Sequence, residues 1–390
     1  MATVNSPLLQ LLERNCELFA GKRVLFVGAL YDPTLLQLTK ECARAQVLCD
    51  SFTTAKAMAA MLGQRLESKL MASATLKHIS VHFAPRQLFT PKECDIICLL
   101  LDKTKAVNQA LLAALTPYLA ADGLVLAAAA NDAGGKSADG YLKGHGICSK
   151  LDSARKCTLW QLHFDKATPF AAPANALVLS AAEKATVLQA LQDHTFPKLD
   201  LSGKPCLEVP LFDHPLVQDC QVFSPMRVDE GTILLLDALH EAPALPQGTA
   251  LDLCCGCGIV GLQLLQQGFA VSASDDSAAA LLLTALNYGQ SGSTNIVSVQ
   301  PSDMLKDLPE GVRYDIIAVN PPFHQGVKTD STLSRSLFNT VAEHLAAQGS
   351  LVLVGNTFLQ YEHTLSNYFA LVKDLRRTTR FAVQRAAQPL

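Results

Sequence analysis

Residues 250–268 read "ALDLCCGCGIVGLQLLQQG". It opens on an apolar run with one acidic residue, passes through two closely spaced glycines, and continues with leucines at helical spacing. This order predicts a buried strand, a tight turn and an amphipathic helix. Glycine in such a turn lets the backbone approach a bound ligand closely. The stretch therefore predicts a nucleotide-type pocket at the end of a β-strand.

Length and composition exclude several classes of protein. The 390 residues are enough for two domains with a core each, and 32 Lys and Arg against 35 Asp and Glu exclude a protein that coats nucleic acid by charge alone. Basic residues outnumber acidic ones in residues 1–200 and the reverse holds in 201–390, which fits polyanion docking by the first half or chance. Scattered cysteines, short apolar runs and a charged opening helix predict a cytoplasmic protein with free thiols and no membrane span.

Strand-like runs alternate with helical patterns along most of the chain, which indicates an α/β fold with a largely parallel sheet. Three landmarks occur twice in the same order, so we expect two copies of one fold. The paired landmarks are "GKRVLFVG" (21–28) with "GTALDLCCGCG" (248–258), "CDIICLLLDKTK" (94–105) with "YDIIAVNPPFHQ" (314–325), and "ADGLVLAAAAND" (121–132) with "AQGSLVLVGNTF" (347–358). The first copy has one glycine at the turn and "LLDKTK" in place of "VNPPFH", so we expect it to be degenerate. Predicted boundaries are 1–165 for the degenerate domain, 166–215 for a connector and 216–390 for the catalytic domain.

The glycine turn fits one cofactor better than another. A dinucleotide-binding fold typically carries the motif GxGxxG. The pattern here is instead D-x-C-x-G-x-G, formed by Asp252, Cys254, Gly256 and Gly258. This pattern fits the S-adenosylmethionine loop of class I methyltransferases. No partner cysteines or histidines at ligand spacing accompany the cysteines of the turn, so we expect no metal.

Acidic residues follow the next two predicted strands. "AVSASDDS" supplies Asp275 and Asp276, which we expect to accept hydrogen bonds from ribose hydroxyls, and "QPSDML" supplies Asp303, which we expect to meet the adenine amine. Any one such acid is more often a helix cap than a ligand contact. Their succession after alternating strands is what favours a cofactor site.

"VNPPFHQGVKT", residues 319–329, ends another buried strand, and ligands bind beyond the carboxyl ends of such strands. Two prolines fix the backbone, so the Asn320 amide and a nearby carbonyl offer rigid acceptors to a planar exocyclic amine. Phe323 would stack on the base. We therefore expect Asn320, Pro321, Pro322 and Phe323 to direct N-methylation by positioning, without a strong base. We expect His324 to contact the substrate at most, and not to act as a general base.

The chain resembles the bacterial ribosomal RNA small subunit methyltransferase C family, guanine-N2 enzymes that act on 16S rRNA. The resemblance covers most of the chain. Besides "NPPFHQGVKT" it rests on "GNTFLQY" (355–361), "RFAVQRA" (380–386), "LDSARKCTLW" (151–160) and "VFSPMRVDEGT" (222–232). It implies two tandem Rossmann-like class I methyltransferase domains, the first inactive and the second catalytic with a seven-stranded, mostly parallel sheet.

The resemblance also implies a site and partners. S-adenosylmethionine would be held by residues of the second domain, and Asn320 to Phe323 would hold the guanine amine. The implied cofactor-binding residues are Phe223, Asp252, Cys254, Gly256, Gly258, Asp275, Asp276, Asp303 and Asn320. Cys254 departs from the family, which usually has glycine there. The implied partner is 16S rRNA in an assembled or assembling small subunit, bound by a monomer, and we expect Arg155 and Lys156 to meet phosphates.

Three alternatives stay open at this point. The large-subunit (23S) guanine-N2 methyltransferases share the two-domain plan and "NPPFH". The same Asn-Pro-Pro module also methylates adenine amines or protein glutamine side chains. A non-catalytic RNA-binding assembly factor would keep the fold alone, although the intact catalytic stretch argues against it.

Overall fold

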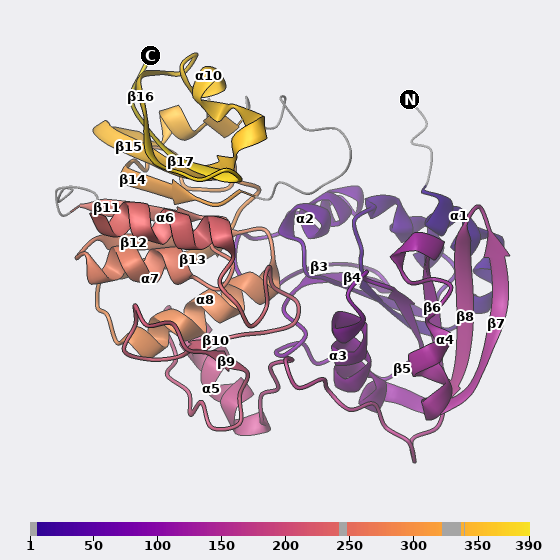
Figure 1. Ribbon diagram of the computed structural model, residues 1–390. Helices are drawn as coiled ribbons and strands as arrows, with labels where there is room; N and C mark the ends of the chain where they lie inside the picture. The colour runs from indigo at the N-terminus through magenta and orange to yellow at the C-terminus, as the bar shows by residue number, and fades with distance from the viewer. Residues whose placement is uncertain (1–5, 242–247, 322–336, 339) are drawn as a thin grey trace. The chain divides into compact units, whose positions relative to one another are not determined.

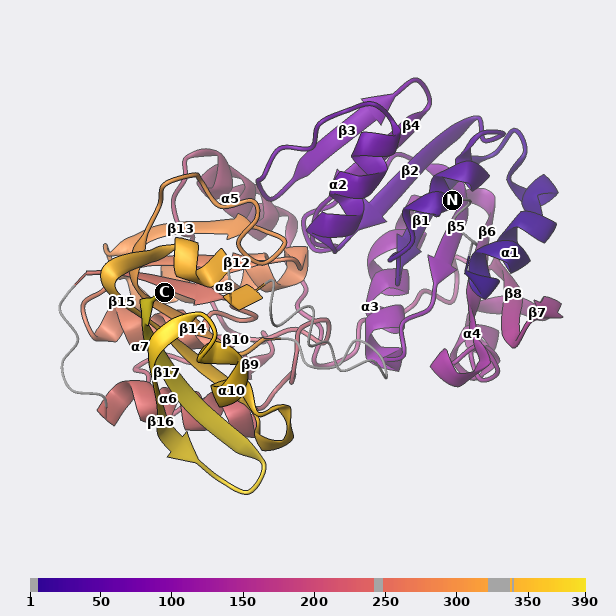
Figure 2. The ribbon, with the colours of Figure 1, turned by 90° about the horizontal axis from the view of Figure 1, so that it is seen from above.

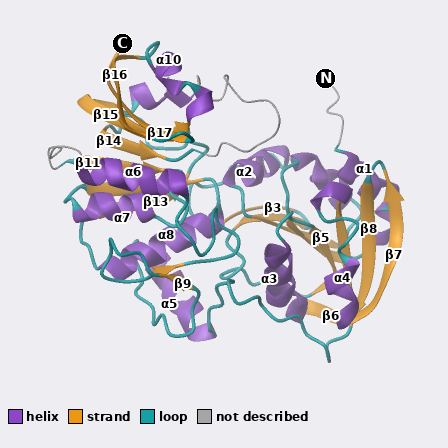
Figure 3. Cartoon of the chain, in the orientation of Figure 1, coloured by secondary structure: helices purple, strands orange, loops and turns teal. Residues whose placement is uncertain are grey.

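The computed structural model describes residues 6–241, 248–321, 337–338 and 340–390. The chain forms two compact units, residues 1–184 and 185–390, and each alternates helices with strands (Figure 3). The predicted connector at 166–215 overlaps the end of one unit and the start of the other; its bounds and those of the two domains stay a prediction. Among the described residues, none of the helices has the length and apolar character needed to cross a membrane.

The first unit is built on an eight-stranded mixed sheet (Figure 1). Its strand order is β3 (Ala72–Leu76), β4 (Ile79–Phe83), β2 (Arg44–Cys49), β1 (Arg23–Gly28), β5 (Cys94–Leu100), β6 (Leu119–Ala130), β8 (Cys157–Phe164) and β7 (Gly146–Ala154). The strands from β4 to β6 are parallel, whereas β3, β8 and β7 pair antiparallel. Its helices are α1 (Pro7–Arg14), α2 (Phe52–Met61), α3 (Lys105–Leu115) and α4 (Asp139–Leu142), and α2 packs on β2 and β4 (Figure 2).

The second unit is built on a seven-stranded sheet. Its order is β13 (Ile296–Pro301), β12 (Ala270–Asp275), β11 (Thr249–Leu253), β14 (Tyr314–Val319), β15 (Leu345–Asn356), β17 (Phe381–Pro389) and β16 (Phe369–Arg377). The first five strands are parallel, and β17 pairs antiparallel with both β15 and β16, which confirms the predicted mostly parallel sheet of seven strands. The helices are α5 (Ala181–Gln192), which begins in the first unit, α6 (Glu230–Glu241), α7 (Ile259–Gln266), α8 (Ala278–Ser291) and α10 (Tyr361–Leu365).

The two units share the same strand arrangement and one equivalent hydrogen bond. In both sheets the strand with the glycine turn lies between the second strand of the unit and the strand that opens with "DII". The backbone N–H of Arg23 donates to Asp95 Oδ2 at 2.8 Å, and that of Thr249 donates to Asp315 Oδ2, also at 2.8 Å. Because the two aspartates open equivalent strands, the duplication predicted from the landmarks is confirmed.

Helix α8 is buried on nearly all sides, as expected for a helix that is apolar all round. One side packs on β12 and β13, and another packs on the short antiparallel pair β9 (Cys206–Leu207) and β10 (Leu216–Val217) (Figure 1). Its position fixes the turn that precedes α7, because polar side chains of α8 reach that turn.

Candidate active site

Three neighbouring strands end together at the carboxyl edge of the second sheet. Leu253 of β11 pairs with Ser274 of β12 on one side and with Val319 of β14 on the other. The residues that follow these strands are therefore adjacent at the edge. The strand order reverses between β11 and β14, and in open α/β sheets ligands bind at such a switch point.

The glycine turn after β11 is held by two polar side chains of α8. Thr284 Oγ1 donates to the Gly256 carbonyl at 3.1 Å, and Asn287 Nδ2 donates to the Cys257 carbonyl at 2.8 Å. Both side chains are fully buried, so the turn is fixed from within the core. Sequence reasoning missed these two residues. Their signal was a pair of polar residues three apart in an otherwise apolar helix.

The two glycines of the turn serve different purposes. Both have positive φ, +57° at Gly256 and +82° at Gly258. A Cβ at Gly256 would meet no atom within 4 Å, so the backbone there borders open space. A Cβ at Gly258 would lie 3.0 Å from Thr284 and Tyr288, so that glycine is needed for packing against α8. Gly256 is thus the part of the turn that a ligand can approach.

Asp252 holds the start of α7. Its Oδ2 accepts a hydrogen bond from the Gly261 N–H at 2.8 Å, in the first turn of that helix, and the residue is 1% exposed. Burial raises the pKa of Asp252 to about 8, although the Gly261 hydrogen bond opposes the shift. The structure therefore gives Asp252 a capping role, and its predicted contact with the cofactor stays a prediction.

Asp275 joins the end of β12 to the glycine turn. Its Oδ2 accepts from the Gly256 N–H and its Oδ1 accepts from the Ser277 N–H, both at 2.9 Å. Burial raises the pKa of this carboxyl above its ordinary value. Each oxygen keeps a further acceptor position, so the carboxyl can also bind ribose hydroxyls beside the open turn. These acceptor oxygens fit the ribose hydroxyls in the adenosyl part of S-adenosylmethionine. Asp276 follows Asp275 in the chain, and its predicted contact with the ribose stays a prediction.

Cys254 adopts a left-handed conformation, with φ +59°, at the position where the resemblance led us to expect glycine. Its thiol lies 3.7 Å from Met304 Sδ. Burial raises the pKa of Cys254, Cys255 and Cys257, so these thiols are protonated at neutral pH. In the described part of the chain, no group of three or more His, Cys, Asp or Glu side chains could hold a metal ion.

Two predicted cofactor residues are not joined to this cluster. Asp303 follows β13, but its Oδ2 accepts from Lys306 Nζ at 2.6 Å, and the pair is partly exposed. Phe223 lies in the segment before α6 with 67% of its surface exposed, so it is not packed against the glycine turn. Their predicted contacts with the cofactor stay predictions.

Asn320 follows β14 and is held by α6. Its Nδ2 donates to Thr232 Oγ1 at 2.9 Å, and Asn320 Oδ1 has no hydrogen-bond partner among the described residues. Pro321 is buried directly after it. The predicted residues Pro322, Phe323 and His324 lie outside the described residues. Sequence reasoning quoted Thr232 within "VFSPMRVDEGT" but assigned it no role.

The first unit lacks these features at the equivalent edge. The repeat aligns Leu100 with Asn320, and Leu100 is 4% exposed. A Cβ at Gly28 would collide with the Leu100 carbonyl oxygen, so glycine is needed where β1 ends beside β5. The first unit therefore has an apolar side chain where the second has the Asn320 amide, which supports the prediction that this copy is degenerate.

Comparisons with known proteins agree with this division. Residues 213–385 match the family described as methyltransferase small domain, and residues 9–176 match its N-terminal domain. The ribosomal RNA small subunit methyltransferase C of Aeromonas hydrophila is 31% identical over 386 residues, covering 98% of both chains. That of Psychromonas ingrahamii is 29% identical and covers 96% of this chain and 95% of its own.

One solved structure matches the whole architecture. It is a 16S rRNA N2 G1207 methyltransferase of T. Thermophilus in complex with AdoMet and guanosine, with a TM-score of 0.75 and 22% sequence identity, and the match covers 99% of this chain and 93% of that one. The likeness shows the same fold along both units. The resemblance and the fold class predicted from the sequence are therefore confirmed, and the chain belongs to the ribosomal RNA small subunit methyltransferase C family.

Proposed function

We propose that this protein transfers a methyl group from S-adenosylmethionine to the exocyclic N2 amine of a guanosine in 16S rRNA. The observation that carries this proposal is the convergence of the open glycine turn, Asp275 and Asn320 at one switch point. Family membership supports the small-subunit target over the large-subunit alternative. The related structure that contains AdoMet and guanosine supports the cofactor and the target base.

Asn320 and Thr232 account for the choice of an amine. Asn320 Nδ2 donates to Thr232 Oγ1, which holds the amide in place and leaves Oδ1 as the acceptor. An acceptor fixed in this way binds an N–H of the guanine amine and directs the nitrogen lone pair along one line. Asn320 takes no proton. The nitrogen releases its proton to water once the new N–C bond has formed.

The rest of the site holds the cofactor. S-adenosylmethionine, when bound, supplies a methyl group activated by the positive charge on its sulfur. Asp275 accepts hydrogen bonds from the ribose hydroxyls, and the open backbone at Gly256 admits the adenosyl group beside it. Asp276, Asp303 and Phe223 extend this pocket in our proposal, and Phe323 stacks on the target base.

We further propose that the protein acts as a monomer in the cytoplasm on an assembled or assembling small subunit, with the first unit docking RNA.

Arg155 and Lys156 support the docking role. They form a tight turn between β7 and β8, with φ +50° and +62°, and both are exposed. Phosphate contacts position an RNA without reading its sequence. Arg155→Gln/Lys156→Gln in the full chain should reduce the salt dependence of RNA binding. An unchanged slope would remove the docking role from this turn.

The proposed reaction is tested with labelled S-adenosylmethionine and ribosomal subunits that lack native methylation. The RNA is digested after incubation and the labelled nucleoside is identified. We expect N2-methylguanosine from the small subunit. Label found in large-subunit RNA alone, or in protein alone, would contradict the proposed target.

A further inference from the structure

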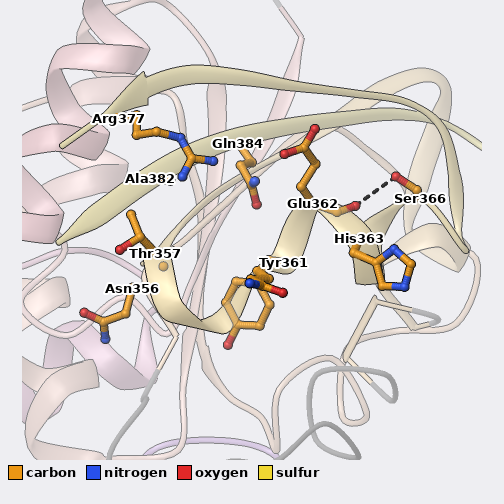
Figure 4. Close-up of a pocket in the computed structure, with 11 residues that line it drawn as sticks. Asn356, Thr357, Tyr361, Glu362, His363, Ser366, Arg377, Ala382 and Gln384 are labelled. Carbon is orange, nitrogen blue, oxygen red and sulfur yellow. Dashed lines mark hydrogen bonds between the residues drawn. The ribbon is translucent and has the colours of Figure 1, made fainter. Parts of the chain in front are cut away.

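A polar cavity of about 390 Å³ lies in the second unit, beyond the ends of β15 and β16 and beside α10 (Figure 4). Nothing in the proposed chemistry uses it. Its polar and aromatic lining consists mainly of one cation, one carboxylate, three amides and two rings. They are Arg377, Glu362, Asn356, Gln360, Gln384, Tyr361 and His363.

The cavity lies at the same edge of the sheet as Asn320. Val319 pairs with Leu353 of the neighbouring β15, so Asn320 is level with Val354. The cavity begins one residue further along, at Gly355. Neighbouring strands are about 4.8 Å apart, so the cavity starts roughly one strand spacing from the residue that holds the target amine.

A single carboxylate positions the cation and one of the amides. Asp374 Oδ2 accepts from Arg377 Nε at 2.7 Å, and Asp374 Oδ1 accepts from Gln384 Nε2 at 3.1 Å. Gln384 is 4% exposed, so its amide is fixed within the wall of the cavity. Figure 4 shows the guanidinium and this amide on one side of the cavity and Tyr361 on another. The two remaining guanidinium nitrogens of Arg377 make no hydrogen bond among the described residues, although the Glu362 carboxylate in the same cavity attracts them electrostatically.

The other wall offers an aromatic ring and an amide. The Tyr361 ring meets Phe338 edge-on, with centroids 5.4 Å apart and planes at 89°, which fixes its orientation. The half-buried Asn356 amide makes no hydrogen bond within the described part of the chain. A buried or half-buried amide without a partner is costly unless water or a ligand binds it.

These groups match the parts of one nucleotide. A guanidinium binds a phosphate, amides bind the edge of a base, and an aromatic ring stacks on its face. We propose that the cavity holds the nucleotide next to the target guanosine in the RNA strand. This inference rests on the proposed function, because it assigns the cavity to the same RNA. An extruded guanosine carries its neighbours to the rim of the site, where such a subsite adds affinity.

The first test is kinetic. Arg377→Met removes the phosphate contact, Asn356→Ala removes the free amide, and Lys373→Met is the matched control because Lys373 is an exposed cation on the same strand outside the cavity. Methyl transfer to small subunits is measured over a range of subunit concentrations. We expect each of the first two variants to raise the KM for subunits about tenfold while kcat changes little, since the contact is made before and during transfer. Unchanged KM values would overturn the subsite.

The second test uses small probes and separates this inference from the proposed function. Binding of guanosine is compared with binding of a trinucleotide that has guanosine at its centre. The full-length wild-type protein should bind the trinucleotide about tenfold more tightly, in line with one stacked base, and Arg377→Met should lose that gain while it binds guanosine as before. Equal binding of both probes by the wild type would overturn the subsite. A raised KM for subunits in the two variants would then mean that the cavity contacts a ribosomal protein and not a nucleotide. Absence of methyl transfer to any RNA by the wild type would instead contradict the proposed function.

Discussion

Thr232 Oγ1 accepts a hydrogen bond from Asn320 Nδ2 at 2.9 Å, which joins the first turn of α6 to the residue that follows β14. The two residues are 88 positions apart in the chain. Thr232 is buried, so the hydrogen bond is screened from water. This contact holds the Asn320 amide through Nδ2 and leaves Oδ1 to face the target base.

Replacing Thr232 with valine should therefore slow methyl transfer without weakening cofactor binding. Valine keeps the shape but cannot accept the hydrogen bond, so the amide loses its fixed orientation. One such hydrogen bond contributes about 1 kcal/mol, and kcat should fall about fivefold. Thr232→Ser keeps the hydroxyl and is the control. A kcat for the valine variant equal to that of the serine variant would show that the contact does not orient Asn320.

Asp252 should make the cofactor-free protein less stable as pH rises. Its pKa is about 8 in the native state against 3.8 in the unfolded chain. Between these values the unfolded chain releases the proton while the native state keeps it, so the free energy of unfolding falls by up to about 1.4 kcal/mol per pH unit. This contribution is fully present below pH 4 and is lost as pH rises toward 8.

Asp252→Asn mimics the neutral carboxyl and should flatten that dependence. Urea unfolding of both proteins at pH 5.5 and pH 8 measures the difference. We expect the variant to be more stable than the wild type already at pH 5.5, because the unfolded Asp252 is ionised there, and to be more stable by a larger margin at pH 8. Parallel losses of stability in the two proteins would show that Asp252 is already ionised in the native state at pH 5.5.

Two glycines of the same segment should respond differently to alanine. A Cβ at Gly261 would collide with the hydroxyl of the fully buried Tyr288, so Gly261→Ala should lower the free energy of unfolding by about 2–3 kcal/mol. Gly256→Ala meets open space but keeps a positive φ, which costs about 1 kcal/mol. Denaturant unfolding of each variant ranks them. The reverse order would mean that backbone conformation, not space, limits this segment.

The left-handed Cys254 should prefer glycine to alanine. Both substitutions remove the thiol, but only glycine relieves the conformational cost at φ +59°. Cys254→Gly should be about 1 kcal/mol more stable than Cys254→Ala. Thermal unfolding of the two variants compares them directly. Equal stabilities would mean that the turn rearranges when the thiol is removed.

The strands and their succession along the chain could be predicted because their signals are local. Apolar runs, glycine turns and the Asp that opens "DII" recur in both halves, and each needs only a few adjacent residues to be recognised. Conformation within the turn was less accessible. The sequence marks Cys254 as an unusual residue, whereas its left-handed φ depends on how the surrounding turn closes.

The roles of individual site residues were harder to predict because they depend on distant partners. Asp252 caps α7, and a capping aspartate looks the same in sequence as a ligand-binding one. Gly261 looks like an ordinary helix glycine until Tyr288 packs on it. Thr232 gains its role only through Asn320. Such pairings come from sheet order and helix packing, which no local pattern records.

In the proposed reaction, the Asn320 amide positions the amine that receives the methyl group. Asn320→Ala tests it most directly when cofactor affinity is measured by calorimetry and transfer to small subunits is measured with labelled cofactor. We predict that kcat falls at least about a thousandfold, as for loss of a group that acts mainly in the transition state, while cofactor affinity stays close to that of the native protein. Retained turnover in this variant would show that the Asn320 amide does not position the target amine.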